Sequence, residues 1–113
     1  MTCVFCQIAA GERAATIVYQ DDLAVAFRDI NPMAPVHILV IPREHMVGPL
    51  DLDDTNAPLA GHLMAVAATV ARQEGIAADG YRIILNQGRN GGQSVFHVHL
   101  HLLGGRRLTW PPG

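Results

Sequence analysis

Residues 93–103 read Gln-Ser-Val-Phe-His-Val-His-Leu-His-Leu-Leu, and this stretch decides the fold that we expect. Three of the chain's six histidines stand there at alternate positions, with apolar residues between and after them. Because successive side chains of a β-strand point to opposite faces of the sheet, the alternation predicts a strand. One face should carry His97, His99 and His101. The other should pack in the core and carry Val98, Leu100 and Leu102.

Three imidazoles on one strand face suggest a metal site, but strand geometry limits this interpretation. Neighbouring side chains on one face repeat roughly every 6–7 Å, so the outer two of three lie about 13 Å apart. Because zinc holds each ligand nitrogen at about 2 Å, two of the histidines could share one ion and the third could not. At least one therefore has another role, and imidazole can act as nucleophile, base or acid near neutral pH.

The alternative to a functional site is a solvated strand face that is merely rich in histidine. The turn Gly91-Gly92-Gln93-Ser94 favours a functional site instead, because it can present backbone N–H groups to an anion.

The length of 113 residues fits one domain, residues 1–113, in which half of the residues are hydrophobic and 16% are charged, as in globular proteins. A net charge of −2 provides no basic surface for a nucleic-acid backbone, although a single nucleotide needs only a local site. No apolar run reaches transmembrane length, and the N-terminus lacks a signal-peptide pattern. We therefore expect a cytoplasmic protein with no nucleic-acid or membrane partner.

The remaining pattern predicts an α+β domain, in which a five-stranded antiparallel sheet packs with one main helix and one short N-terminal helix. The short helix covers residues 3–10 and ends at Gly11. The main helix begins after capping residues at 53–56, and Glu74 is its last residue before Gly75. The strands are expected at residues 17–19, 23–28, 36–41, 81–86 and 95–103.

The main helix has two apolar sides. One stripe consists of Leu59, Leu63, Val66 and Val70, and a second side of smaller residues contains Met64, Ala67, Ala68 and Ala71. A helix that is apolar on two sides must bury both. One side can cover the sheet, and we expect the other to pack against a second copy of the chain in a homodimer. The alternative is a partly exposed, alanine-rich face.

Cys3 and Cys6 are the only cysteines, and a pair three positions apart cannot form a disulfide framework. In a reducing compartment a Cys-x-x-Cys pair indicates metal binding or redox chemistry. A redox pair is disfavoured because no thioredoxin-like βαβ pattern surrounds it. Two thiolates form half of a tetrahedral zinc site, which His45 and His97 could complete. The alternative is two reduced cysteines packed in a small core.

The sequence His-Val-His-Leu-His-Leu-Leu at 97–103 resembles the motif of the histidine triad superfamily of nucleotide hydrolases and transferases. Residues 91–95 before it, and residues 104–107 and 110–113 after it, resemble the Hint branch, the histidine triad nucleotide-binding proteins of bacterial type. The resemblance covers essentially the whole chain. It implies a sheet extended across a homodimer, and a tail at 104–113 that docks near the partner's active site through Trp110. Local packing of Trp110 on its own subunit is the alternative.

His99 is the only one of the three strand histidines with a same-face imidazole on both sides, so we expect it to be the nucleophile. The resemblance implies the same role: the middle histidine attacks the α-phosphorus of a nucleotide, and water then hydrolyses the nucleotidyl-histidine. Attack requires that the other ring nitrogen carry the proton and donate it to an acceptor. The resemblance places that acceptor at a backbone carbonyl near His37, which could otherwise be a satisfied core histidine. It gives His101 a polar contact to the phosphate or the leaving group, and histidine there favours hydrolysis over nucleotidyl transfer.

The resemblance also implies the contacts to the nucleotide. The hydroxyl and N–H of Ser94 and the N–H of Val95 should meet the phosphate. Further phosphate and ribose contacts are expected from Asn86 and Gln93. The Asp29 carboxylate suits the paired ribose hydroxyls. An apolar slot for the base is expected from Val4, Phe5, Phe27 and Ile30. Taken alone, a Ser, Asn or Asp at these places is more often turn chemistry.

The resemblance implies a purine nucleoside phosphoramidate hydrolase that needs no cofactor for its chemistry. The resemblance implies a structural zinc ion held by Cys3, Cys6, His45 and His97, which leaves His99 free. One alternative is a dinucleoside polyphosphate hydrolase, which shares the triad. Another is a nucleotide-binding scaffold whose hydrolysis is incidental. Arg28 stands where histidine is common in this branch and leaves the selectivity for purines open. No carboxylate adjoins the triad, so the leaving group's proton should come from a histidine or the substrate.

Overall fold

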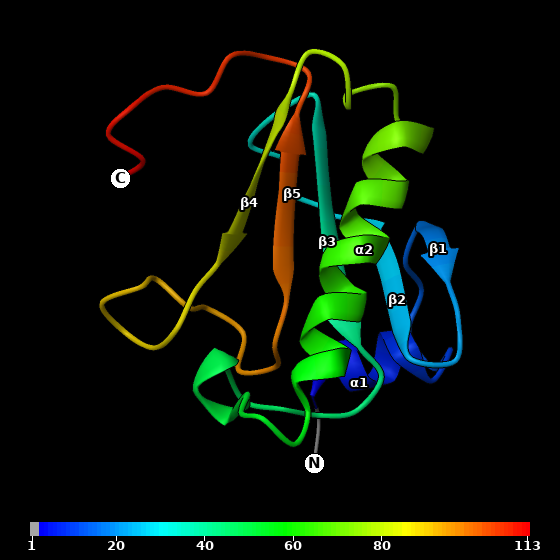
Figure 1. The fold of residues 1–113 in the computed structure, drawn as a ribbon. Helices are drawn as coiled ribbons and strands as arrows, with labels where there is room; N and C mark the ends of the chain where they lie inside the picture. Colours follow the sequence, from blue (N-terminus) through cyan, green and yellow to red (C-terminus); the bar gives the residue numbers. More distant parts are fainter. Residues whose placement is uncertain (1–2) are drawn as a thin grey trace.

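One antiparallel sheet forms the centre of the molecule, and a long helix lies across one of its faces (Figure 1). The computed structural model describes residues 3–113. The elements run in the order α1 (Val4–Ala9), β1 (Ile17–Gln20), β2 (Ala24–Arg28), β3 (Val36–Pro42), a 3₁₀ turn (Pro49–Asp51), α2 (Ala57–Gln73), β4 (Tyr81–Leu85) and β5 (Leu100–Gly104). The strand order is β1-β2-β3-β5-β4, with every neighbouring pair antiparallel. The predicted α+β fold with five strands, a main helix and a short N-terminal helix is confirmed.

Two hydrophobic cores lie on the two faces of the sheet, because alternate residues of each strand point to opposite sides. On β2, Ala24 and Ala26 belong to the core under α2, whereas Val25 and Phe27 belong to the core that contains Phe5 of α1. The central strand β3 is buried along nearly its whole length, as expected for a strand covered on both faces. The second core is the smaller one, and the histidines lie beside it.

The histidine strand is shorter than predicted. The ladder of β5 begins only at Leu100, so residues 95–99 precede the strand. The register pairs Val40 with Leu100, and an antiparallel continuation would place residue 98 opposite Pro42, which has no N–H to donate. Val98 instead donates its N–H to the Met46 carbonyl at 2.7 Å, in the loop after β3. The alternation survives in the burial: the core under α2 contains Val98, Leu100 and Leu102.

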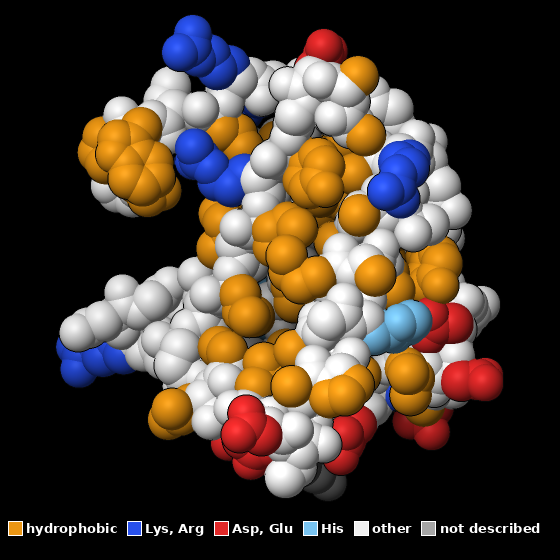
Figure 2. Space-filling model, in the orientation of Figure 1, with side chains coloured by type: hydrophobic (Ala, Val, Ile, Leu, Met, Phe, Trp, Pro, Cys, Tyr) orange, Lys and Arg blue, Asp and Glu red, His pale blue; other side chains and the backbone are white. Residues whose placement is uncertain are grey.

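The predicted division of α2 into two apolar sides is wrong in part. Ala67 and Ala71 are fully buried in the same core as Leu63, so these small residues allow the helix to approach the sheet closely. Met64, by contrast, is half exposed at 50%. Figure 2 shows hydrophobic side chains gathered on the face formed by α2 and the neighbouring edge of the sheet. On β4, the edge strand there, Tyr81 and Leu85 are exposed to 38% and 40%.

Within the described residues, α2 is the longest helix, and neither it nor any other is long and apolar enough to cross a membrane.

Candidate active site

A pocket of about 580 Å³ lies on the sheet face opposite α2, between α1, the β2–β3 loop and the segment that leads into β5. Its lining brings together most of the residues that the sequence predicted for a nucleotide site. These are Val4, Phe5, Phe27, Asp29, Ile30, His37, Ser94, Val95, His99 and His101. Residues far apart in sequence thus converge on one cavity, of a volume usual for small-molecule sites.

His99 is buried, with 4% of its surface exposed, and its ring orientation is fixed by one hydrogen bond. Its Nδ1 lies 2.8 Å from the backbone carbonyl of His97, which can only accept, so Nδ1 carries the proton. The Nε2 lone pair is therefore available to the pocket. The acceptor was predicted near His37, and this is wrong. The carbonyl of His97 is free to accept because residues 95–99 lie outside the ladder of β5.

His37 and His101 form a pair whose tautomers follow from one backbone donor. The N–H of Met33 donates to His37 Nδ1 at 3.0 Å, so a neutral His37 carries its proton on Nε2. That Nε2 lies 2.9 Å from His101 Nδ1 and donates to it. His101 must then carry its own proton on Nε2. The ring centroid of His101 lies 4.9 Å from that of His99, so the two imidazoles are neighbours in the pocket.

Burial keeps this pair of imidazoles neutral at physiological pH. It lowers the pKa of His101 to about 4, with smaller contributions from the neighbouring His99 and His37. Burial also lowers the pKa of His37, against the opposing effect of the Asp29 carboxylate. Both rings can therefore act as neutral hydrogen-bond donors, rather than as fixed cations, at pH 7.

Asp29 has one oxygen committed to the turn and one that points towards the histidines. Its Oδ1 accepts from the N–H of Asn31 at 2.8 Å, which is the turn chemistry that the sequence offered as the alternative. Its Oδ2 lies 3.4 Å from His37 Nε2 at the edge of the pocket. The two interpretations of this residue are therefore compatible.

The apolar part of the pocket is built around Phe5. Its ring meets the rings of Phe27 and His99 edge-on, at centroid distances of 5.5 and 5.2 Å. The sequence analysis missed Ile8, Ala15 and Leu39, which also line the slot. The helical spacing of Phe5 and Ile8 could have revealed Ile8, because residues three apart share a helix face.

Three predicted nucleotide contacts lie outside this lining. Gln93 is buried, donates to the Val47 carbonyl at 2.6 Å and accepts from the Gly88 N–H at 2.8 Å, so its amide is used to shape the loop instead. Asn86 is half-buried beyond the end of β4. Trp110 is 82% exposed, so its alternative interpretation, packing on its own subunit, is wrong.

Arg28, at the pocket edge, is directed to the far end of α2. Its guanidinium makes a bidentate pair with Glu74, at 2.7 and 3.0 Å. This ion pair raises the pKa of Arg28 above its usual value. The guanidinium is therefore bound to Glu74 and not directed into the pocket.

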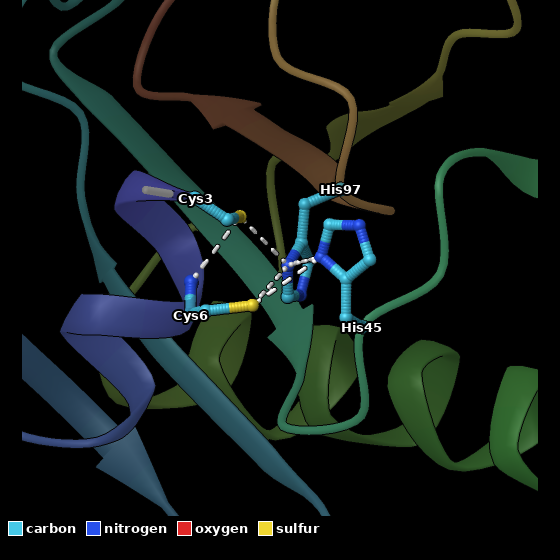
Figure 3. Close-up of side chains that lie close together, drawn as sticks. All are labelled: Cys3, Cys6, His45 and His97. Atoms are coloured by element: carbon cyan, nitrogen blue, oxygen red, sulfur yellow. Dashed lines mark hydrogen bonds between the residues drawn. The ribbon is translucent and has the colours of Figure 1, made fainter. Parts of the chain in front are cut away.

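The four predicted metal ligands form a second, separate cluster (Figure 3). The sulfurs of Cys3 and Cys6 lie 3.4 and 3.5 Å from His97 Nδ1, and Cys6 Sγ lies 3.3 Å from His45 Nδ1. The two Nδ1 atoms are 3.1 Å apart, and all four ligand atoms lie within 4.8 Å of one another. Tetrahedral zinc places such atoms about 3.3–3.8 Å apart, given its bond lengths.

The donor chemistry of this cluster also fits zinc. His97 Nε2 lies 2.9 Å from the Pro42 carbonyl and donates to it, which leaves the Nδ1 lone pair directed at the sulfurs. Burial and the adjacent Cys3 raise the pKa of the Cys6 thiol, so two thiolates at this place need a cation to hold them. Cys3, Cys6, His45 and His97 would hold the ion and leave His99 and His101 unligated.

Comparison with known proteins defines the family. The HIT domain matches residues 10–108, and the chain therefore belongs to the HIT family. Purine nucleoside phosphoramidase of Escherichia coli is 51% identical over 105 residues, which cover 93% of this chain and 88% of that protein. The 14 kDa zinc-binding protein of Zea mays is 47% identical over 112 residues, with 97% and 87% covered. The crystal structure of a HIT family hydrolase from Legionella pneumophila superposes with a TM-score of 0.97 at 47% identity, covering 99% of this chain and all of that one.

Proposed function

We propose that this protein hydrolyses the P–N bond of purine nucleoside 5′-phosphoramidates. One observation carries the proposal: His99 donates through Nδ1 to the His97 carbonyl and so presents an unprotonated Nε2 to a nucleotide-sized pocket. The similarity to purine nucleoside phosphoramidase over nearly the whole chain supports the choice of substrate class.

The reaction proceeds in two displacements at phosphorus. The Nε2 lone pair of His99 attacks the α-phosphorus, the P–N bond breaks, and the amine leaves with a proton. The leaving nitrogen takes its proton from the substrate, in which that nitrogen can be protonated before attack. We assign His101 Nε2–H, whose ring centroid lies 4.9 Å from that of His99, to a hydrogen bond with the phosphate oxygens. Water then attacks phosphorus, the bond to Nε2 breaks, and the nucleoside monophosphate leaves. The proton that water releases passes to solvent, and His99 returns to its neutral form with the proton on Nδ1.

The nucleoside fits the remaining parts of the same pocket. Phe5 and Phe27 provide apolar and aromatic surface for the base, and Asp29 provides a carboxylate for the ribose hydroxyls. The exposed hydroxyl of Ser94 and the N–H of Val95 are assigned to the phosphate. Asn86 does not line the pocket, so its proposed contact to the phosphate or ribose requires that the nucleotide or the loop after β4 move.

The decisive experiment looks for the covalent intermediate. Wild-type protein and His99→Ala are mixed briefly with adenosine 5′-monophosphoramidate, and intact mass and AMP release are followed together. We expect a transient adenylyl adduct and AMP release in the wild type and neither in His99→Ala. His62→Ala is the matched control, because His62 lies on α2 and pairs with Asp21 at 2.7 Å, away from the pocket. Undiminished turnover by His99→Ala would disprove the assignment of the nucleophile.

We also propose that the active protein is a homodimer joined through the exposed sides of α2 and β4, which would extend the sheet across two subunits. Support comes from the exposed apolar side chains Met64, Tyr81 and Leu85 and from the free edge of β4. In such a dimer the exposed Trp110 of one tail is assigned to the partner's active site. The cytoplasmic location stays a prediction.

A further inference from the structure

We propose that the metal cluster positions the catalytic histidine and the base slot, so that zinc and nucleotide bind cooperatively. The proposal rests on the proposed function for the identity of the nucleotide. It concerns His97, which is one of the four ligands, and Phe5, which lines the pocket. Each connects the four-ligand cluster to the pocket through contacts that are present in the structure.

The first connection is His97, whose three polar groups serve three purposes. Its Nδ1 is directed at the two sulfurs, its Nε2 donates to the Pro42 carbonyl, and its own carbonyl accepts from His99 Nδ1. Fixing the His97 ring in the cluster therefore fixes the carbonyl that selects the tautomer of the nucleophile. No residue intervenes between the metal ligand and this acceptor, because both are parts of His97.

The second connection is Phe5, which lies in α1 between the two cysteine ligands. Its ring meets His97 at 5.9 Å and His99 at 5.2 Å, edge-on in both cases. The same ring lines the base slot beside Phe27. Because α1 has only six residues, too few for a stable isolated helix, its position depends on such contacts. Holding Cys3 and Cys6 at one ion would therefore hold Phe5 in place.

The segment that carries His97 and His99 lies outside the β5 ladder. Its backbone is joined to the loop after β3 by the hydrogen bond from the Val98 N–H to the Met46 carbonyl. Met46 directly follows the ligand His45. Two ligands thus flank this hydrogen bond, so the cluster closes a ring through His45, Met46, Val98 and His97. A metal ion that fixes His45 and His97 would therefore also fix the backbone of the segment that carries His99.

Cooperativity of this kind is reciprocal, which provides a test that does not measure turnover. If zinc raises the affinity for a nucleotide by some factor, the nucleotide raises the affinity for zinc by the same factor. AMP is the probe. Its dissociation constant is measured by calorimetry on zinc-loaded and chelator-stripped protein, and zinc affinity is measured by chelator competition with and without saturating AMP. We expect both factors to agree, at about fivefold or more.

A second readout follows the nucleophile itself. Nitrogen-15 NMR of the imidazoles should show His99 as a single tautomer protonated on Nδ1 when zinc is bound, and as a mixture of tautomers in the stripped protein. Phe5→Ala keeps all four ligands and should reduce the coupling factor, whereas His62→Ala should leave it unchanged. Circular dichroism shows whether the stripped protein stays folded, because unfolding on zinc loss would by itself link zinc and AMP binding. Where it unfolds, the coupling factor of Phe5→Ala relative to that of the wild type decides.

The outcomes separate this inference from the proposed function. Equal AMP affinity with and without zinc, together with an unchanged His99 spectrum, overturns the coupling and leaves the hydrolase proposal intact. Absence of zinc binding overturns it as well. Failure of AMP to bind either form refutes the proposed function instead, and the His99 spectrum alone then decides whether the cluster positions the nucleophile.

Discussion

His37 acts in the pocket through another histidine. Its Nε2 donates to His101 Nδ1 and so leaves the proton of His101 on Nε2. A donor that is fixed before substrate arrives needs no reorganisation during the reaction. We therefore assign His37 as a positioning residue, whose effect should appear in the rate more than in binding.

Replacing His37 tests this assignment. We expect His37→Phe to lower kcat for phosphoramidate hydrolysis by about ten- to a hundredfold, because His101 loses the donor that selects its tautomer. KM should change little. His37→Gln retains an N–H that can reach His101 and should recover part of the rate. Steady-state kinetics of the two variants check this expectation, and a loss in His37→Gln as large as that in His37→Phe would contradict the assignment.

The same two histidines make stability depend on pH. The folded protein lowers the pKa of His37 and brings that of His101 to about 4, below the value near 6.5 in an unfolded chain. The unfolded chain then binds protons first as the pH falls. Their stabilising contribution is complete above about pH 6.5 and is lost as the pH falls towards 4. Urea denaturation between pH 7.5 and 4.5 should show this decline, and His101→Gln should make it shallower.

Most residues that line the pocket were predictable from the sequence, but the backbone acceptor for His99 Nδ1 was not. The triad pattern and the resemblance identified His99, yet the acceptor for its Nδ1 was expected near His37. The true acceptor, the His97 carbonyl, is available only because the β5 ladder ends at Leu100. That limit depends on the register that places residue 98 opposite Pro42, and register is a tertiary property that local alternation does not contain.

Within α2, the corrected core face can be tested at two alanines. Ala67 is fully buried, whereas Ala65 is exposed. Ala67→Leu should lower the free energy of unfolding by about 1–3 kcal/mol, because added methylenes have no room in a packed core. Ala65→Leu should change it by less than about 0.5 kcal/mol. Chemical denaturation of both variants decides the matter, and a neutral Ala67→Leu would restore the face that we first expected.

The error in α2 shows what periodicity leaves undetermined. Helical spacing placed Leu63, Val66 and Val70 correctly in the core. It could not assign Ala67 and Ala71, because alanine is compatible with either environment and the width of the buried stripe depends on how closely the helix approaches the sheet. Strand β3 was easier to predict, since it reads as an apolar run closed by Pro42.

For the whole molecule, the dimer proposal predicts that charged substitutions disrupt the dimer on the α2–β4 side of the sheet but not at the β1–β2 edge. Met64→Glu combined with Leu85→Glu should convert a dimer into monomers in sedimentation experiments, because two charges would be buried at the interface without partners. Leu23→Glu, at a residue that is 52% exposed beside the opposite β1–β2 edge, should stay dimeric. A wild-type protein that sediments as a monomer at high concentration would contradict the proposal.

The two histidines of the metal cluster should differ in mutational tolerance. His45 is exposed, and its polar contacts among the described residues lie within the cluster. Its only requirement is to bind the metal, which cysteine or aspartate can also do. His97 is fully buried and must also donate from its second ring nitrogen to Pro42. Cysteine and aspartate have no such second donor. In a saturation library selected for metal retention, position 97 should therefore remain histidine while position 45 diversifies.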